Sequence, residues 1–102
     1  MEYAIEQNMP KEKLRIFCRN HKIKRLALFG SAIRDELMPD SDIDILVEFL
    51  EDNTPGLFEL SRMEIELTGI LGRQVDLRTP DELSRYFRDE VVRTAETQYE
   101  AT

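Results

Sequence analysis

Two short stretches of the chain are almost entirely apolar, and they restrict the fold more than any other feature. Residues 26–29 read Leu-Ala-Leu-Phe and end at Gly30, and residues 43–49 read Ile-Asp-Ile-Leu-Val-Glu-Phe. A strand with one wet face alternates apolar and polar residues, whereas an unbroken apolar run is typical of a strand that is buried on both faces. The sequence therefore predicts two buried strands, over residues 23–29 and 43–49.

Helical patterns account for most of the remaining chain. The predicted helices cover residues 11–20, 32–37, 57–70 and 79 to about 94. A third, short strand is predicted at residues 74–77, between the last two helices. Residues 96–102 have no apolar period and are expected to fray, so a single domain over residues 1–102 should have its core at about 11–93.

The charge balance restricts the kind of partner. The chain has 102 residues, with 14 Lys and Arg against 21 Asp and Glu, and its formal net charge is −7. Such a balance opposes attachment to nucleic-acid phosphates, so we expect no direct nucleic-acid binding and exclude a polymerase that grips DNA through its backbone. The length allows one modest core without a separate substrate domain, so a large acceptor must bring its own binding surface.

The cysteine content and the hydropathy indicate the compartment. Cys18 is the only cysteine, so no disulfide forms within the chain, and its place among the apolar positions of the first helix predicts a packing role. No basic and apolar leader opens the chain, and no apolar stretch approaches 18 residues. We therefore expect a cytoplasmic protein with no membrane association.

Two acids interrupt the start of the second apolar run. Asp42 and Asp44 are two residues apart, so on a strand their side chains leave the same face, with Cα atoms about 6.5–7 Å apart. Unpaired charges in an apolar segment are costly, and oxygen ligands of this kind suit Mg²⁺, which also keeps waters and substrate phosphates in its shell. The alternative is a turn at Asp42 and a solvated carboxylate at Asp44.

A glycine and a serine follow the first apolar run. Gly30 and Ser31 lie where a strand is expected to end and a helix to begin, and a helix N-terminus offers free N–H groups and a positive dipole end to an anion. Glycine allows close approach, the Ser31 hydroxyl adds a donor, and Arg34 lies one turn further on. These three residues are the candidate nucleotide-binding set.

Asp76 is a third candidate acid, between the apolar residues Val75 and Leu77 of the third predicted strand. If that strand lies beside the second one, Asp76 completes a cluster with Asp42 and Asp44. In a two-metal phosphoryl or nucleotidyl transfer, a third acid either binds the second ion or takes the proton of the attacking hydroxyl. The alternative is an ion pair between Asp76 and Arg73 or Arg78.

The spacing of these residues resembles the signature of the DNA polymerase beta nucleotidyltransferase superfamily. The signature is Gly30-Ser31, ten further residues, Asp42-x-Asp44 and a later strand with Asp76. The motif Phe-Gly-Ser-Ala-x-Arg at residues 29–34 and the short length of the chain resemble the minimal, MNT-type members most. The resemblance covers residues 11–93.

The resemblance implies a fold and a site. The fold is α+β, a small mixed sheet of the palm type flanked by about four helices. The metal and catalytic residues are Asp42, Asp44 and Asp76, with Mg²⁺, most simply two ions, and ATP as the donor substrate. Gly30 and Ser31 hold the phosphates.

The resemblance also implies a partner. Members of this size are often antitoxins that silence a HEPN-type ribonuclease toxin by transferring AMP to a tyrosine hydroxyl. Two alternatives stay open: a non-catalytic antitoxin that inhibits its partner by stoichiometric contact, and an enzyme that modifies a small molecule, which the missing substrate domain disfavours.

Overall fold

The computed structural model describes residues 10–30, 42–51 and 54–101. In chain order the elements are α2 (Lys11–Asn20), β1 (Ile23–Phe29), β2 (Ile43–Phe49), α3 (Leu57–Leu71), β3 (Val75–Arg78), the 3₁₀ turn η2 (Pro80–Glu82), α4 (Arg88–Thr94) and β4 (Glu96–Glu100). All three predicted strands and the predicted helices at 11–20 and 57–70 are confirmed. The helix predicted at residues 32–37 lies outside the described residues.

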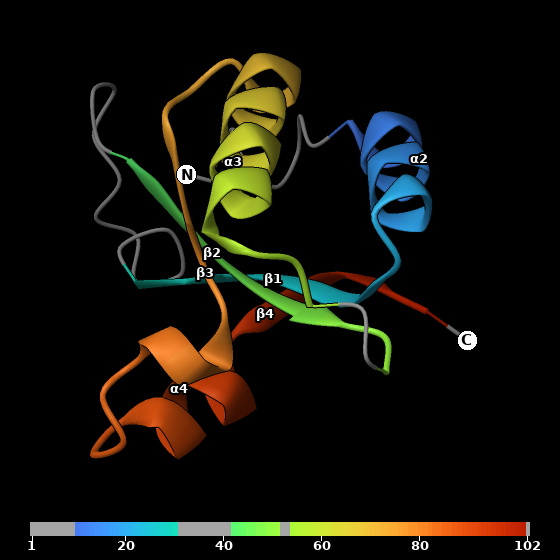
Figure 1. The fold of residues 1–102 in the computed structure, drawn as a ribbon. Coiled ribbons are helices and arrows are strands. Elements are labelled where there is room, and N and C mark those ends of the chain that lie inside the picture. The colour runs from blue at the N-terminus through green and yellow to red at the C-terminus, as the bar shows by residue number, and fades with distance from the viewer. Residues whose placement is uncertain (1–9, 31–41, 52–53, 102) are drawn as a thin grey trace, which may run out of the picture.

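The four strands form one mixed sheet in the order β3-β2-β1-β4. β1 pairs antiparallel with both β2 and β4, whereas β2 and β3 run parallel because α3 returns the chain to the same end of the sheet. Figure 1 shows α2 and α3 above the sheet and α4 below it. The α+β class with a small mixed sheet is confirmed, with three α-helices in the described part of the chain.

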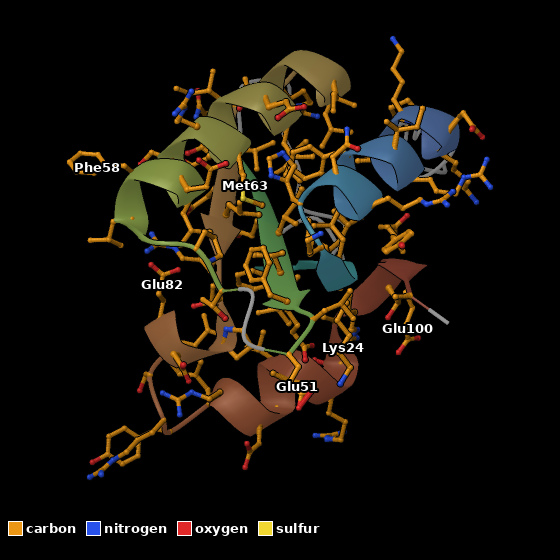
Figure 2. All side chains as sticks on the ribbon, turned by 45° about the vertical axis from the view of Figure 1, so that its right-hand side comes forward. Lys24, Glu51, Phe58, Met63, Glu82 and Glu100 are labelled. Atoms are coloured by element: carbon orange, nitrogen blue, oxygen red, sulfur yellow. The ribbon has the colours of Figure 1, made fainter. Side chains whose placement is uncertain are left out.

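The unbroken apolar runs are explained by cover on both faces. Ile43, Ile45 and Val47 of β2 belong to the larger cluster beneath α2 and α3, whose helical members include Phe17 and Met63. On the opposite face, Leu46 of β2 packs in a smaller cluster next to α4. The buried members of this smaller cluster are Ala27, Leu46 and Ala95. Figure 2 shows Met63 directed from α3 toward the sheet. None of the helices in the described ranges is long and apolar enough to cross a membrane.

Side chains of α3 cover the outer edge of β3. The hydroxyl of Thr68 accepts a hydrogen bond from the N–H of Val75 at 3.1 Å, and the carboxylate of Glu64 accepts one from the N–H of Leu77 at 2.8 Å. An open sheet edge presents unpaired backbone groups that recruit other strands. Here α3 satisfies two of them and fixes β3 against β2.

The prediction of one helix from Thr79 to about Thr94 is wrong. The chain does begin a helical turn at Thr79, where the Glu82 carboxylate accepts a hydrogen bond from the Thr79 N–H at 2.9 Å. Leu83 then takes an extended conformation, with φ −88° and ψ 150°, and ends the turn. Leu83 packs against the smaller cluster, and α4 starts only at Arg88.

The prediction of a frayed tail at residues 96–102 is also wrong. Residues 96–100 form β4, which pairs with β1, and the N–H of Ala101 donates to the carbonyl of Lys24 at 2.8 Å. An edge strand with only one partly covered face needs few apolar residues. Tyr99 is the member of β4 that packs against the larger cluster.

Arg25 joins three strands to α4. Its Nη1 donates to the carbonyl of Val92 at 2.9 Å and its Nη2 to the carbonyl of Ala95 at 3.0 Å, so the guanidinium caps the C-terminal end of α4. Its Nε donates to Thr97 Oγ1 at 2.8 Å. Nη1 also forms an ion pair with Glu48 at 3.3 Å, and both side chains are largely buried. Cations are favourable at a helix C-terminus, where carbonyl groups lack partners.

Replacement of Arg25 should therefore destabilise the protein. Arg25→Met leaves two helix-end carbonyls and the Glu48 carboxylate without their donor, and we expect the free energy of unfolding to fall by about 2–4 kcal/mol. Urea denaturation measures this. Arg62→Met, at an exposed cation of α3, is the control and should change stability by less than about 0.5 kcal/mol. Equal effects of the two substitutions would contradict the role of Arg25.

Cys18 has the predicted packing role, because its side chain is fully buried in the larger cluster. Burial raises the pKa of its thiol from 9.0 to about 12, so the thiol stays protonated at neutral and mildly alkaline pH. We expect iodoacetamide at pH 8 to modify the folded protein at least about 100-fold more slowly than the urea-unfolded protein, as measured by mass spectrometry. Similar rates in the two states would show that the thiol is accessible.

Candidate active site

The sheet places Asp44 directly beside Asp76. β2 and β3 pair in a parallel register that joins Ile43 to Val75 and Asp44 to Asp76. Residues that are partners in register point to the same face, and neighbouring strands are about 4.8 Å apart. The condition set by the sequence, that the third strand lie beside the second, is thus fulfilled.

Both acids project from the face opposite α2 and α3. Their neighbours Ile43, Ile45 and Val75 are buried in the larger cluster, so the alternate positions face away from it. Asp44 is half-buried, and Asp42, which is exposed, lies two residues earlier, just before β2. The N–H of Ile43 donates to the carbonyl of Gln74 at 2.9 Å and ties this end of β2 to the chain that enters β3.

Gly30 lies against Asp44 from the other side. Phe29, the last residue of β1, pairs with Asp44, and Gly30 follows with φ +68°. A Cβ atom at this position would overlap Oδ2 of Asp44 and would lie 3.1 Å from its Cγ. Glycine is therefore required at position 30 for two reasons: the backbone is left-handed, and the Asp44 carboxylate lies where a side chain would be. Ser31 and Arg34, the other candidate phosphate-binding residues, lie outside the described residues.

Asp76 is held by Arg78, two residues along the same face of β3. Arg78 Nε lies 3.0 Å from Oδ1 of Asp76, and Nη2 lies 3.4 Å from Oδ2. This is one of the ion pairs that the sequence left open as an alternative. Both side chains are partly exposed, and an ion pair of this kind contributes about 0–1 kcal/mol, so it can be exchanged for another cation at little cost.

The acids are aligned by the backbone rather than gathered around a common point. Within residues 10–30, 42–51 and 54–101, no three His, Cys, Asp or Glu side chains are grouped closely enough to hold a metal ion. The carboxylate of Asp76 is turned to Arg78 instead. The candidates nevertheless offer only oxygen donors, from adjacent positions on one face, which is the donor type that Mg²⁺ prefers.

A hollow of about 390 Å³ opens beside Asp76, at the β3 edge of the sheet. Its walls come from the first half of α3, from β3 and from η2: the lining residues are Leu57, Leu60, Ser61, Glu64, Asp76, Leu77, Arg78 and Glu82. Leu57 and its neighbour Phe58 are 75% and 90% exposed. Figure 2 shows Phe58 projecting from the first turns of α3 into solvent, with Glu82 below the same end of the helix.

The hollow was not predicted from the sequence, because three separated segments build it. One signal was present in the sequence. At 100° per residue, Phe58 falls on the side of α3 away from Met63 and Leu67, which are its buried residues. Leu57 and Ile65, which the predicted apolar period included, are also exposed.

Comparison with known proteins assigns the fold to a family. Residues 10–99 match the family model of the nucleotidyltransferase domain. A Methanocaldococcus jannaschii protein, MJ0435, to which protein adenylyltransferase activity is ascribed, is 38% identical over 88 residues, which make up 86% of this chain and 92% of that protein. A solved structure described as a minimal nucleotidyltransferase is 34% identical with a TM-score of 0.71, and the match covers 88% of this chain and 90% of that chain.

A second solved structure is a complex. It contains a tri-AMPylated HEPN toxin of Shewanella oneidensis with an MNT antitoxin, and a chain in it is similar to this one with 25% identity and a TM-score of 0.66, over 93% of this chain and 73% of that chain. The family match over residues 10–99 and the paired acids beside Gly30 agree with each other. The chain belongs to the nucleotidyltransferase domain family, and its resemblance to the minimal members of that family is confirmed.

Proposed function

We propose that this nucleotidyltransferase transfers AMP from ATP to a tyrosine hydroxyl of a HEPN-type toxin and so acts as its antitoxin in the cytoplasm. The observation that carries the proposal is the register of Asp44 against Asp76 with Gly30 on the other side of Asp44. The relatives support the acceptor class, since one is ascribed protein adenylyltransferase activity and another was solved with an AMP-modified toxin.

The donor triphosphate is assigned to the end of β1. Gly30 has no side chain and a left-handed backbone, so the Asp44 carboxylate lies directly against the chain segment that is assigned to the phosphates. Ser31 and Arg34 complete the phosphate-binding set in this proposal, through a hydroxyl donor and a bidentate guanidinium. ATP is assigned as the donor because the modified toxin in the related complex carries AMP.

Asp42, Asp44 and Asp76 are the residues that would hold Mg²⁺, most simply two ions. When bound, the metal neutralises the triphosphate charge and lowers the pKa of the attacking hydroxyl. The fit rests on the all-oxygen donor set, on the register of Asp44 with Asp76, and on the close approach that Gly30 allows. Asp76 has to exchange its ion pair with Arg78 for the new cation.

The transfer itself is a substitution at the α-phosphorus. The acceptor oxygen forms a bond to that phosphorus, the bond to the β-phosphate bridging oxygen breaks, and pyrophosphate leaves. Asp76 lies on the β3 side of Asp44, next to the hollow, and is assigned the role of accepting the proton from the acceptor hydroxyl. Asp42 and Asp44 orient the donor.

The combined substitution Asp42→Asn and Asp44→Asn should abolish transfer. It removes two negative charges but keeps the side-chain volume, and we expect transfer of label from α-labelled ATP to the partner to fall by at least about 1,000-fold, with the far-UV circular dichroism unchanged. Asp89→Asn, at an exposed acid of α4, is the control and should retain full activity. Undiminished labelling by the double variant would refute the assignment.

Gly30→Ala should separate the role of the glycine from general stability. The methyl group has to displace the Asp44 carboxylate and strain the backbone, and displacement by about 1 Å typically costs 100-fold in rate. Gly69→Ala is the matched control, because nothing lies within 4 Å of a Cβ there and alanine favours a helix. Steady-state labelling measures both. Equal rates for the two variants would show that Gly30 is not needed for the reaction.

One observation favours a second candidate, a non-catalytic antitoxin that inhibits by contact alone. Asp76 is paired with Arg78, and no metal-binding group of three acids is assembled in the described part of the chain. The two candidates differ in stoichiometry. A non-catalytic antitoxin inhibits at most one partner molecule per copy, whereas an enzyme modifies a partner that is present in excess.

A further inference from the structure

The first two residues of α3 are an unusual surface feature. Leu57 and Phe58 are adjacent, large and apolar, and they are 75% and 90% exposed. Single exposed apolar residues are ordinary, but an adjacent pair of which one member borders a hollow is an arrangement that suits a docking partner. Leu57 is itself a wall of the 390 Å³ hollow that also includes Asp76.

The charge of the hollow indicates what fits inside. Three carboxylates line it, from Glu64, Asp76 and Glu82, against one cation, Arg78. Two of the acids also hold backbone groups, because Glu64 accepts from the N–H of Leu77 and Glu82 from the N–H of Thr79, so their positions are fixed. The excess of negative charge favours a segment with a basic side chain.

The hollow is continuous with the site assigned above. Asp76 belongs to both, so a segment lying in the hollow brings its neighbouring residues to the acid that is assigned the acceptor proton. A volume of 390 Å³ holds a few side chains and not a folded domain. The rest of the contact has to form on the surrounding surface, where Leu57 and Phe58 lie.

We propose that the hollow between α3, β3 and η2 is the docking site for the acceptor segment of the modified protein, with Leu57 and Phe58 as its apolar anchors. The segment carries an apolar residue that covers Phe58 and a basic residue that enters between Glu64 and Glu82. This inference rests on the proposed adenylyltransferase function and adds the surface that selects the acceptor.

The test compares a double variant, Leu57→Ser combined with Phe58→Ser, with the single control variant Ile16→Ser. All three residues are exposed and apolar, and Ile16 lies on α2, remote from the hollow, so the variants differ in place rather than chemistry. With a HEPN-type toxin from the same genome as acceptor, we expect the double variant to raise KM for the toxin about tenfold. The values of kcat at saturating toxin and of KM for ATP should stay unchanged, and Ile16→Ser should match the unmodified protein. An unchanged KM for the toxin would overturn the proposal.

A second measurement locates the segment directly. Phe58→p-benzoylphenylalanine allows photo-crosslinking to the toxin, and the crosslinked peptide should lie within a few residues of the hydroxyl that receives AMP. Ile16→p-benzoylphenylalanine should give no such product. Crosslinks only from position 16, or to a region distant from the modified hydroxyl, would overturn the docking site.

The proposed function and the docking site can fail separately. If the unmodified protein transfers no AMP, the proposed function fails. The docking site is then decided by binding alone, as the dissociation constant for the toxin measured by titration calorimetry. The double serine variant should weaken this binding about tenfold, and unchanged binding would contradict the docking site as well.

Discussion

The parallel pairing of β2 with β3 is the interaction on which the site depends. It places Asp44 and Asp76 opposite each other, while the antiparallel pairing with β1 brings Gly30 against the other side of Asp44. A slip of one residue would turn Asp76 toward the core and put Val75 on the acid face. Burial of Val75 and Leu77 and the two hydrogen bonds that the β3 backbone donates to side chains of α3 oppose such a slip.

One face of the sheet forms most of the hydrophobic core, and the other carries the acids. The face beneath α2 and α3 carries the larger cluster and supplies most of the buried apolar surface, whereas the opposite face has a small cluster around Leu46 and Ala95. Among the residues that the structure describes, Asp44 is half-buried on this opposite face and Asp42, just before β2, is exposed. Arg25 holds the C-terminal end of α4 to β1.

The central strands and the acid pair could be predicted from sequence because their signals are local. An unbroken apolar run identifies a strand covered on both faces, and Asp42 and Asp44 stand out against it. The register of Asp76 could not be derived locally, since it depends on strand order. The tail was mispredicted because β4 is an edge strand whose stability comes from pairing with β1, and the last helix because Leu83 leaves the helical conformation to pack against the smaller cluster. The hollow could not be predicted from the sequence, because its walls come from residues as far apart in the chain as Leu57 and Glu82.

We propose that the aligned acids beside Gly30 catalyse repeated transfer of AMP to a protein hydroxyl. The most direct test is the intact mass of a HEPN-type toxin from the same genome after incubation in large molar excess over this protein with Mg²⁺ and ATP. We expect most of the toxin molecules, far more than there are copies of the enzyme, to gain the mass of one or more AMP groups. Toxin of unchanged mass, inhibited only in a one-to-one complex, would contradict it.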